Sequence, residues 1–191
     1  TADITVDGAA APGSRDVSVT APGGAATVTG GFTVFPRMVS PDGWEWQNPL
    51  PQGDNLHSVW GSASNDIFLS GSGGTILHYN GSTWSRMNTG VASYLAAVWG
   101  TSASDVFAVG ESGTTLHYNG STWSTMASAT ARTLEGVWGS SPSDVFAVGT
   151  YGTILHYDGI TWSTMASPTT AGLYDVWGSA SNDVFAVGST Y

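Results

Sequence analysis

Histidine and aspartate recur in this chain at a spacing that raises the question of chemistry. Three histidines lie at a constant interval of 39 residues, at His78, His117 and His156. Four aspartates keep the same interval, at Asp66, Asp105, Asp144 and Asp183. Three imidazoles that converge could bind zinc, and a histidine beside a carboxylate could transfer protons. Either chemistry requires the fold to bring these residues to one place.

The interval of 39 residues extends to whole stretches of sequence. The clearest copy runs from Leu134 to Met165, and further copies begin at Leu56, Leu95 and Leu173. Tryptophans recur at two positions of the repeat, in the sets Trp60, Trp99, Trp138 and Trp177 and Trp84, Trp123 and Trp162. The chain therefore consists largely of repeats, over 56–94, 95–133, 134–172 and an incomplete 173–191.

Each copy predicts four short strands. In the third copy β-branched and aromatic residues fill 134–139, 144–149, 153–157 and 161–165, while Gly, Ser, Pro and Asp fill the turns between them. Four strands at a period near 40 are typical of a β-propeller blade. We therefore predict an all-β chain with a partial β-propeller of four-stranded blades, preceded by part of an immunoglobulin-like β-sandwich.

The repeats also resemble a known class of propellers. The strings DVFAVG, GTILHY and DGITW of the third copy are similar to BNR/Asp-box and kelch-like propellers, including bacterial secreted propellers akin to photosystem II assembly factors. The spacing from acid to Trp is one residue shorter than in an Asp-box, and Asn80 and Asn119 replace the acid in two copies. The resemblance covers 44–191 and implies the fold; propellers host many unrelated functions.

A propeller places equivalent residues on a ring, so the three histidines should lie far apart. We expect them to be buried hydrogen-bonding residues, the aspartates to fix the first turn by accepting backbone N–H bonds, and the tryptophans to fill the space between blades. Sialidase chemistry needs an arginine cluster, whereas Arg86 and Arg132 fall at non-equivalent positions. We therefore expect no enzyme activity, no metal and no cofactor.

Differences between the copies indicate where a ligand could bind. The linkers between blades, the start of the first strand and the second turn vary, and in an up-and-down blade all three lie at one end of the strands. The candidate ligand-binding residues are His57, Glu111, Glu135, Tyr151, Tyr174 and Asp175. The alternative is neutral drift in tolerant loops.

The residues before the repeats predict two further segments. Alternating strands over 16–20, 26–29 and 32–35, with a turn at 21–24, resemble the C-terminal part of an IPT/TIG-type immunoglobulin-like module over 1–36. Residues 37–55 form a connector, in which 44–50 predicts the outer strand of a blade. Because three and a half blades do not close a ring, we expect a longer chain of about six to eight blades. Four-bladed closure through 44–50 is the rival.

The composition excludes some classes of partner and favours an extracellular location. The four basic residues are all arginine and the net charge is −10, so neither nucleic acid nor an anionic membrane is an expected partner. There is no cysteine, and no run of about 18 apolar residues could insert into a membrane. Abundant small and hydroxyl residues with few charges are common in secreted bacterial surface proteins.

These features together predict a non-catalytic extracellular binding, adhesion or scaffold module of a larger bacterial surface or secreted protein. Its partner would be a protein or a glycan at the variable end of the propeller. Two alternatives stay open: a structural subunit of an extracellular assembly or filament that pairs through open blade edges, and a lectin-like propeller. Asn80 and Asn119 also match the N-glycosylation acceptor sequence.

Overall fold

The computed structural model describes residues 13–21, 24–34, 38–39, 45–46 and 53–189, with side chains over 53–189. The chain divides into two units, Thr1–Leu50 and Pro51–Tyr191, which are described separately. Within the described ranges no helix is long and apolar enough to span a membrane.

The first unit contains two short antiparallel pairs. Strand β1 (Gly13–Ala21) pairs with β2 (Gly24–Val34), with a register shift between Arg15 and Val17. The expectation of separate strands over 26–29 and 32–35 is wrong, because β2 is continuous through Gly30 and Gly31. Strand β3 (Met38–Val39) pairs with β4 (Glu45–Trp46), which is the described part of the strand predicted over 44–50. Residues 1–12 of the predicted immunoglobulin-like module lie outside the described residues.

The second unit is a succession of antiparallel sheets, one for each sequence repeat. Sheet 1 comprises β5 (Leu56–Ala63), β6 (Asp66–Gly71), β7 (Ile76–Tyr79) and β8 (Trp84–Met87). Sheet 2 comprises β9 (Leu95–Ser102), β10 (Asp105–Gly110), β11 (Thr115–Tyr118) and β12 (Trp123–Thr125). Sheet 3 comprises β13 (Leu134–Ser141), β14 (Asp144–Gly149), β15 (Thr153–Tyr157) and β16 (Trp162–Thr164). The terminal sheet has two strands, β17 (Leu173–Ala180) and β18 (Asp183–Gly188).

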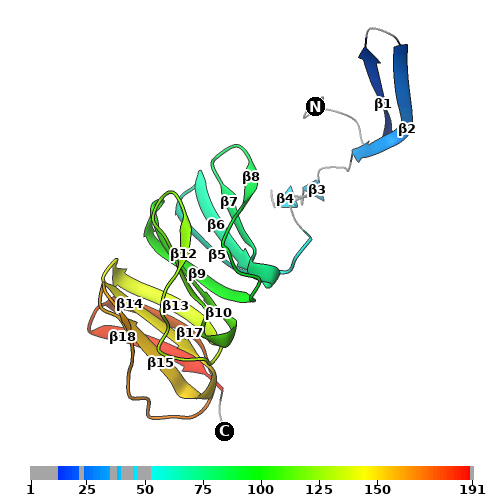
Figure 1. The fold of residues 1–191 in the computed structure, drawn as a ribbon. Helices are drawn as coiled ribbons and strands as arrows, with labels where there is room; N and C mark the ends of the chain where they lie inside the picture. Colours follow the sequence, from blue (N-terminus) through cyan, green and yellow to red (C-terminus); the bar gives the residue numbers. More distant parts are fainter. Residues whose placement is uncertain (1–12, 22–23, 35–37, 40–44, 47–52, 190–191) are drawn as a thin grey trace. The chain divides into compact units, whose positions relative to one another are not determined.

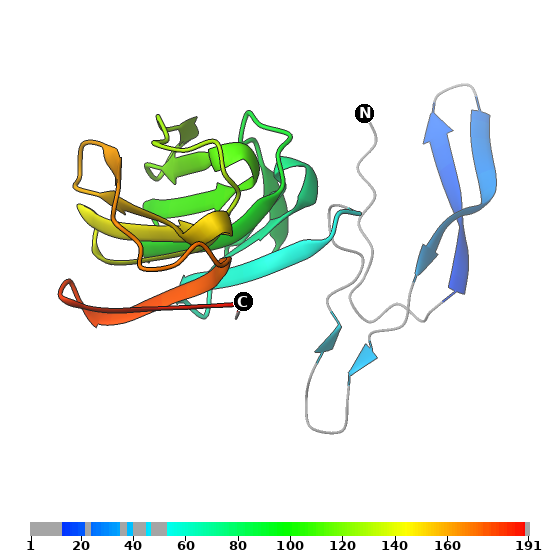
Figure 2. The same cartoon turned by 90° about the horizontal axis from the view of Figure 1, so that it is seen from below.

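Strand order within each complete sheet follows the chain, so every blade is a simple meander. The first strands β5, β9, β13 and β17 contact one another in turn, which is the arrangement of a propeller around its axis. Figures 1 and 2 show the sheets succeeding one another in chain order, from cyan through green and yellow to red. The second unit is therefore a partial β-propeller, as the sequence predicts.

A short 3₁₀ turn joins the second and third strands of each complete sheet. These turns are η1 (Ser72–Gly74), η2 (Glu111–Gly113) and η3 (Thr150–Gly152). Their middle residue has positive φ, which Gly73 adopts without strain but Ser112 (56°) and Tyr151 (57°) adopt at a cost. The last residue is always glycine, because a Cβ at Gly152 would lie 1.9 Å from the carbonyl oxygen of Thr169.

The core consists of the joints between neighbouring sheets. In the joint between sheets 2 and 3, Phe107 and Val109 pack against Val137, Leu155 and Trp162, all of them buried. The first-strand Trp of each sheet lies over a glycine of the next, so that a Cβ at Gly139 would lie 2.7 Å from Trp99. The fourth-strand Trp donates its indole N–H to a methionine of the preceding sheet, as Trp123 Nε1 does to Met87 Sδ at 3.3 Å. Area removed from water at these joints stabilises the fold at about 25 cal/mol per Å².

Candidate binding face

The recurring aspartate, histidine and hydroxyl side chains form the same network in every complete blade. In sheet 3, Asp144 Oδ1 lies 2.7 Å from His156 Nε2, and Asp144 Oδ2 accepts a hydrogen bond from Ser140. Sheets 1 and 2 repeat this network with Ser62, Asp66 and His78 and with Thr101, Asp105 and His117. In the terminal sheet Asp183 accepts the hydroxyl of Ser179.

This geometry corrects two expectations. The aspartates accept side-chain donors, rather than the backbone N–H groups that we expected, and so connect the first turn to the third strand. The histidines are about a quarter to a third exposed rather than buried, and each bonds within its own blade and lies beside a phenylalanine, as His156 does with Phe146 at 4.7 Å between ring centroids.

The network differs from a catalytic triad in its order. In a triad the histidine lies between the hydroxyl and the carboxylate and removes the hydroxyl proton. Here the carboxylate lies in the middle, so the hydroxyl of Ser140 donates to Asp144 and is not bonded to His156. The arrangement fixes a turn. Within residues 53–189, and the shorter described stretches before them, no group of three His, Cys, Asp or Glu residues could hold a metal ion.

The 3₁₀ turns and the linkers between blades lie together at the opposite end of the strands. Backbone hydrogen bonds join Glu111 N to Tyr94 O (2.9 Å) and Thr150 N to Thr133 O (3.0 Å), and each turn also contacts the first strand of the next sheet. We call this end the variable face; it comprises η1–η3, the linkers 88–94, 127–133 and 166–172, and the starts of β5, β9, β13 and β17.

The structure brings the sequence candidates of this face together in two groups. In the first group, His57 lies 4.6 Å from Tyr94 between ring centroids, and burial and the nearby Glu135 both raise the pKa of the Tyr94 phenol. Glu111 belongs to η2, which contacts β13, the strand of Glu135. Among residues 53–189 neither Glu111 nor Glu135 has an arginine partner.

The second group consists of aromatic and charged side chains near the terminal sheet. Tyr151 belongs to η3, which contacts β17, the strand of Tyr174 and Asp175. The guanidinium of Arg132 lies 4.7 Å above the Tyr151 ring and donates to its carbonyl oxygen at 3.3 Å. Asp175 accepts the backbone N–H of Val176. His57, in sheet 1, is separated from Tyr151, in sheet 3, by the whole of sheet 2.

Two side chains of the variable face, Tyr94 and Arg132, were not among the sequence candidates. Tyr94 and Arg132 both lie in linkers that the comparison of copies marks as variable, so the signal was present. Their contacts with His57, Glu135 and Tyr151 depend on residues of neighbouring copies, and the repeat period does not specify such contacts.

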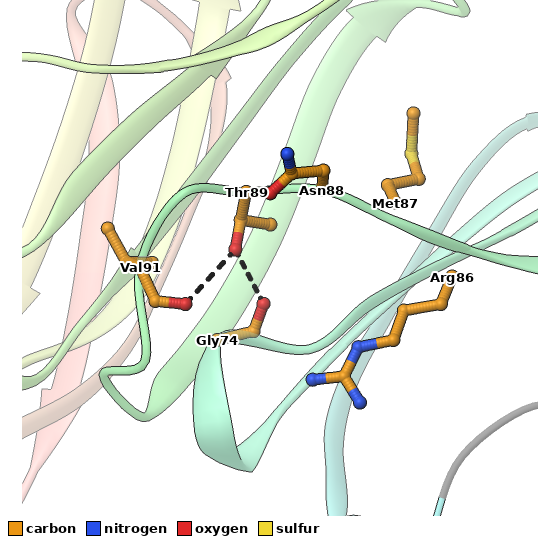
Figure 3. A pocket seen from close by; sticks show the side chains of 6 residues that line it. All are labelled: Gly74, Arg86, Met87, Asn88, Thr89 and Val91. Atoms are coloured by element: carbon orange, nitrogen blue, oxygen red, sulfur yellow. Dashed lines mark hydrogen bonds between the residues drawn. The ribbon is translucent and has the colours of Figure 1, made fainter.

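A hollow of about 320 Å³ opens beside the linker between sheets 1 and 2 (Figure 3). Its lining residues are Gly74, Arg86, Met87, Asn88, Thr89 and Val91. Thr89 Oγ1 donates to the carbonyl oxygens of Gly74 (2.7 Å) and Val91 (3.4 Å), so the hydroxyl fastens the linker to η1. Arg86 pairs with Asp54 at 3.2 Å. The contacts of Thr89 and Arg86 are explained by local structure.

Comparisons with known proteins support the fold alone. No model of a protein family matches the chain, and no curated protein does. Among solved structures, the chain is similar to YCF48 from Cyanidioschyzon merolae, with 19% identity and a TM-score of 0.59 over 71% of this chain and 48% of that chain. It is also similar to YCF48 bound to D1 peptide, with 16% identity and a TM-score of 0.52 over 85% of this chain and 52% of that chain.

A computationally designed protein, Ika4, is a third neighbour, with 14% identity and a TM-score of 0.54 over 74% of this chain and 96% of that chain. The present chain thus spans about half the length of the YCF48 chains that it matches. At these identities the likeness establishes the β-propeller fold alone. It says nothing of function, because propellers of one architecture host unrelated functions.

Proposed function

We propose that this chain is a non-catalytic protein-binding module whose variable face binds a cationic, aromatic-containing segment of another protein. The observation that carries this proposal is the content of that face: Glu111 and Glu135, which have no arginine partner among residues 53–189, and exposed tyrosines at the same end of the strands. Glu111 is exposed, and Tyr151 and Tyr174 are 68% and 58% exposed. Tyrosine is enriched at interfaces because it adds apolar area together with a hydrogen-bonding tip.

The net charge of the chain and the structural neighbours both support a protein partner that carries basic residues. With a net charge of −10, long-range electrostatics attract basic partners and slow the approach of acidic ones. A structural neighbour with the same fold, YCF48, has been solved bound to D1 peptide, so a propeller of this architecture can bind a peptide. We further propose an extracellular or cell-surface location in a bacterium, a place among BNR/Asp-box and kelch-like propellers, and an immunoglobulin-like N-terminal module.

The test is selection of binding peptides from a random displayed library against the intact chain. We expect selected sequences to be rich in Lys, Arg and aromatic residues, and their binding to weaken with salt. The double variant Glu111→Gln/Glu135→Gln and the variant Tyr151→Ser should each weaken binding at least about tenfold, which corresponds to roughly 1.4 kcal/mol. Ile160→Ser is the control, because Ile160 is exposed in the turn between the third and fourth strands. Peptides that bind the Glu111→Gln/Glu135→Gln variant as tightly as the parent would contradict the proposal.

A glycan is the second candidate ligand, because exposed Tyr151 and Tyr174 could stack on sugar rings. Binding on a glycan array that disappears with Tyr151→Ser or Tyr174→Ser would support it, and the absence of glycan binding would exclude it. Glycosidase turnover by the intact chain would contradict the non-catalytic proposal.

A further inference from the structure

The turn between the third and fourth strands has the same backbone conformation in sheets 1, 2 and 3. Its glycine has a φ of 91° at Gly81, 89° at Gly120 and 92° at Gly159. The residue before the glycine donates its N–H to a threonine carbonyl oxygen, at 3.3 Å in each sheet. A Cβ on any of the three glycines would lie 2.7–2.8 Å from a residue of the first turn of the same sheet, so the position requires glycine.

The residue before this glycine differs between the sheets. It is Asn80 in sheet 1, Asn119 in sheet 2 and Asp158 in sheet 3, and all three are exposed. Each Oδ1 accepts two backbone N–H groups, at 3.0 Å for both asparagines and at 2.9 and 2.8 Å for the aspartate. An ionised acceptor shortens such hydrogen bonds. The turn therefore accommodates aspartate at least as well as asparagine.

An asparagine that precedes glycine can modify itself without a cofactor or an oxidant. The backbone nitrogen of the glycine attacks the side-chain Cγ, the Cγ–Nδ2 bond breaks, and ammonia leaves with the amide proton. A succinimide ring remains, and one water molecule opens it. Cleavage between the nitrogen and Cγ gives aspartate. Cleavage at the main-chain carbonyl carbon gives isoaspartate, in which the chain runs through Cγ.

The turn of sheet 1 is arranged for the attack. The Gly81 N–H has no hydrogen-bond partner among the described residues, so its nitrogen is available. Negative charge develops on Asn80 Oδ1 during the attack, and the N–H groups of Ser82 and Thr83 already donate to this oxygen. Donors fixed where charge develops lower the barrier, as in an oxyanion hole. The equivalent donors lower the pKa of Asp158, so they stabilise negative charge at this place in the turn.

The folded turn also favours one of the two products. Aspartate needs no change of backbone, because sheet 3 has the same φ and the same hydrogen bonds around Asp158. Isoaspartate adds a carbon to the main chain and displaces the glycine, which has no room to move toward the first turn. A Cβ on Gly81 would lie 2.8 Å from the Cβ of Asn65. Ring opening in the folded turn should therefore give mostly aspartate.

We propose that Asn80 and Asn119 are sites of self-modification, at which the folded turn converts asparagine into aspartate. Sheets 1 and 2 thereby acquire the Asp-Gly turn that sheet 3 has in its sequence. Each conversion adds one negative charge to a chain with a net charge of −10. Both sites lie beside the first turns, at the end of the strands opposite the variable face. The proposal is therefore independent of the function proposed for that face.

Peptide mapping by mass spectrometry tests the proposal on the intact folded chain during incubation in neutral buffer. We expect the mass change from amide to acid at Asn80 and Asn119. Asn88 is the internal control, because its Oδ1 accepts the N–H of Gly90 at 3.1 Å and the residue after it is Thr89. Conversion of Asn88 at the same rate, or no conversion at Asn80 and Asn119 in the folded chain, would overturn the proposal.

Sheet 3 offers a matched test by gain of the modification. Asp158→Asn places an asparagine before Gly159, where the N–H donors of Ile160 and Thr161 are already in position. We expect position 158 of this variant to become aspartate as fast as Asn80 does. Asp158→Gln is the control and should stay unconverted, because the longer side chain must close a larger ring. An asparagine at position 158 that persists while the chain is folded by circular dichroism would contradict the proposal.

The ratio of the two products tests the role of the folded turn. We expect the ratio of aspartate to isoaspartate to be at least about fivefold higher in the folded chain than in the chain unfolded in urea, which corresponds to about 1 kcal/mol, the contribution of one hydrogen bond. An endoproteinase that cleaves before aspartate but not before isoaspartate measures the ratio. The double variant Asn80→Asp/Asn119→Asp supplies the reference digest, free of isoaspartate at these sites. Equal ratios in the two states would refute selection of the product by the turn.

Discussion

The cross-strand pair Ser70 and Ile76 allows a stability prediction to be worked from the structure. These residues face each other in β6 and β7, at the positions that Val109 and Thr115 occupy in sheet 2. Ser70 is fully buried, and its hydroxyl has no hydrogen-bond partner among the described residues. Thr115, in contrast, donates its hydroxyl to the carbonyl oxygen of Met126 at 3.2 Å. A buried hydroxyl without a partner costs about 1–3 kcal/mol.

The test replaces Ser70 with valine and Ile76 with threonine, the residues that sheet 2 carries at the same two positions. Ser70→Val alone removes the unpaired hydroxyl but adds volume beside Ile76. Overpacking costs about 1–3 kcal/mol, as much as the hydroxyl did, so the net change in stability should be near zero. Ile76→Thr alone should destabilise by about 1–3 kcal/mol, because it leaves a void and a second buried hydroxyl beside Ser70. The double variant conserves volume and gives the new hydroxyl at position 76 the carbonyl of Met87 as acceptor, so we expect a gain of about 1–2 kcal/mol.

Urea unfolding followed by far-ultraviolet circular dichroism measures these differences, provided that the slope m stays constant. The double-mutant cycle should show strong favourable coupling between positions 70 and 76. Val109→Ser is a control in the next joint and should destabilise, because it places a serine where Val109 is fully buried. A double variant no more stable than the parent would refute the reasoning and show that the Ser70 hydroxyl carries no penalty.

Three further predictions concern the turns and joints. Gly139→Ala should destabilise by about 1–3 kcal/mol more than Gly61→Ala, because a new Cβ would meet Trp99 at Gly139 and would meet no tryptophan of the described residues at Gly61. Equal losses in urea unfolding would contradict this. Backbone N–H groups of Thr161 and Ile160 lower the pKa of Asp158. The ionised Asp158 therefore stabilises the fold fully above the ordinary pKa of 3.8, and this stabilisation is lost as pH falls through the lowered pKa. The difference in unfolding free energy between Asp158→Asn and the parent should therefore shift in favour of the variant as pH falls, because only the parent loses this stabilisation. A difference that stays constant with pH would count against this. Ser112→Gly should stabilise by about 1 kcal/mol by relieving positive φ, and Tyr151→Gly by less because it loses the Arg132 contact; thermal unfolding that ranks them in reverse would contradict the strain argument.

The repeat period predicted the blades well because local chemistry decides their strands. The second and third strands of sheet 3 begin and end where the sequence predicts, since Gly and Asp at the turns and β-branched residues between them leave little choice. The first strand runs two residues further than predicted, to Ser141, because a register shift between Gly139 and Ser141 continues the pairing into the turn.

The partners of repeated residues were harder to predict. The period shows that Ser140, Asp144 and His156 recur as a set, but the assignment of Asp144 to side-chain donors depends on how the first turn folds back over β15. Contacts between copies were less predictable still, because equivalent positions carry different residues, as Ala96 and Glu135 do at the position of His57. Sequence comparison could mark the end of the blade where variation gathers, but not which neighbours meet there.

The regularity of the joints has a consequence for how the molecule opens. Because each sheet contacts only its neighbours, stability resembles a one-dimensional series of couplings between units. Sheets 2 and 3 each contact a sheet on either side, so the stability of each depends on two joints. A substitution that weakens the joint between sheets 2 and 3 should therefore speed amide exchange in β10 and in β14 together, because both sheets depend on that joint.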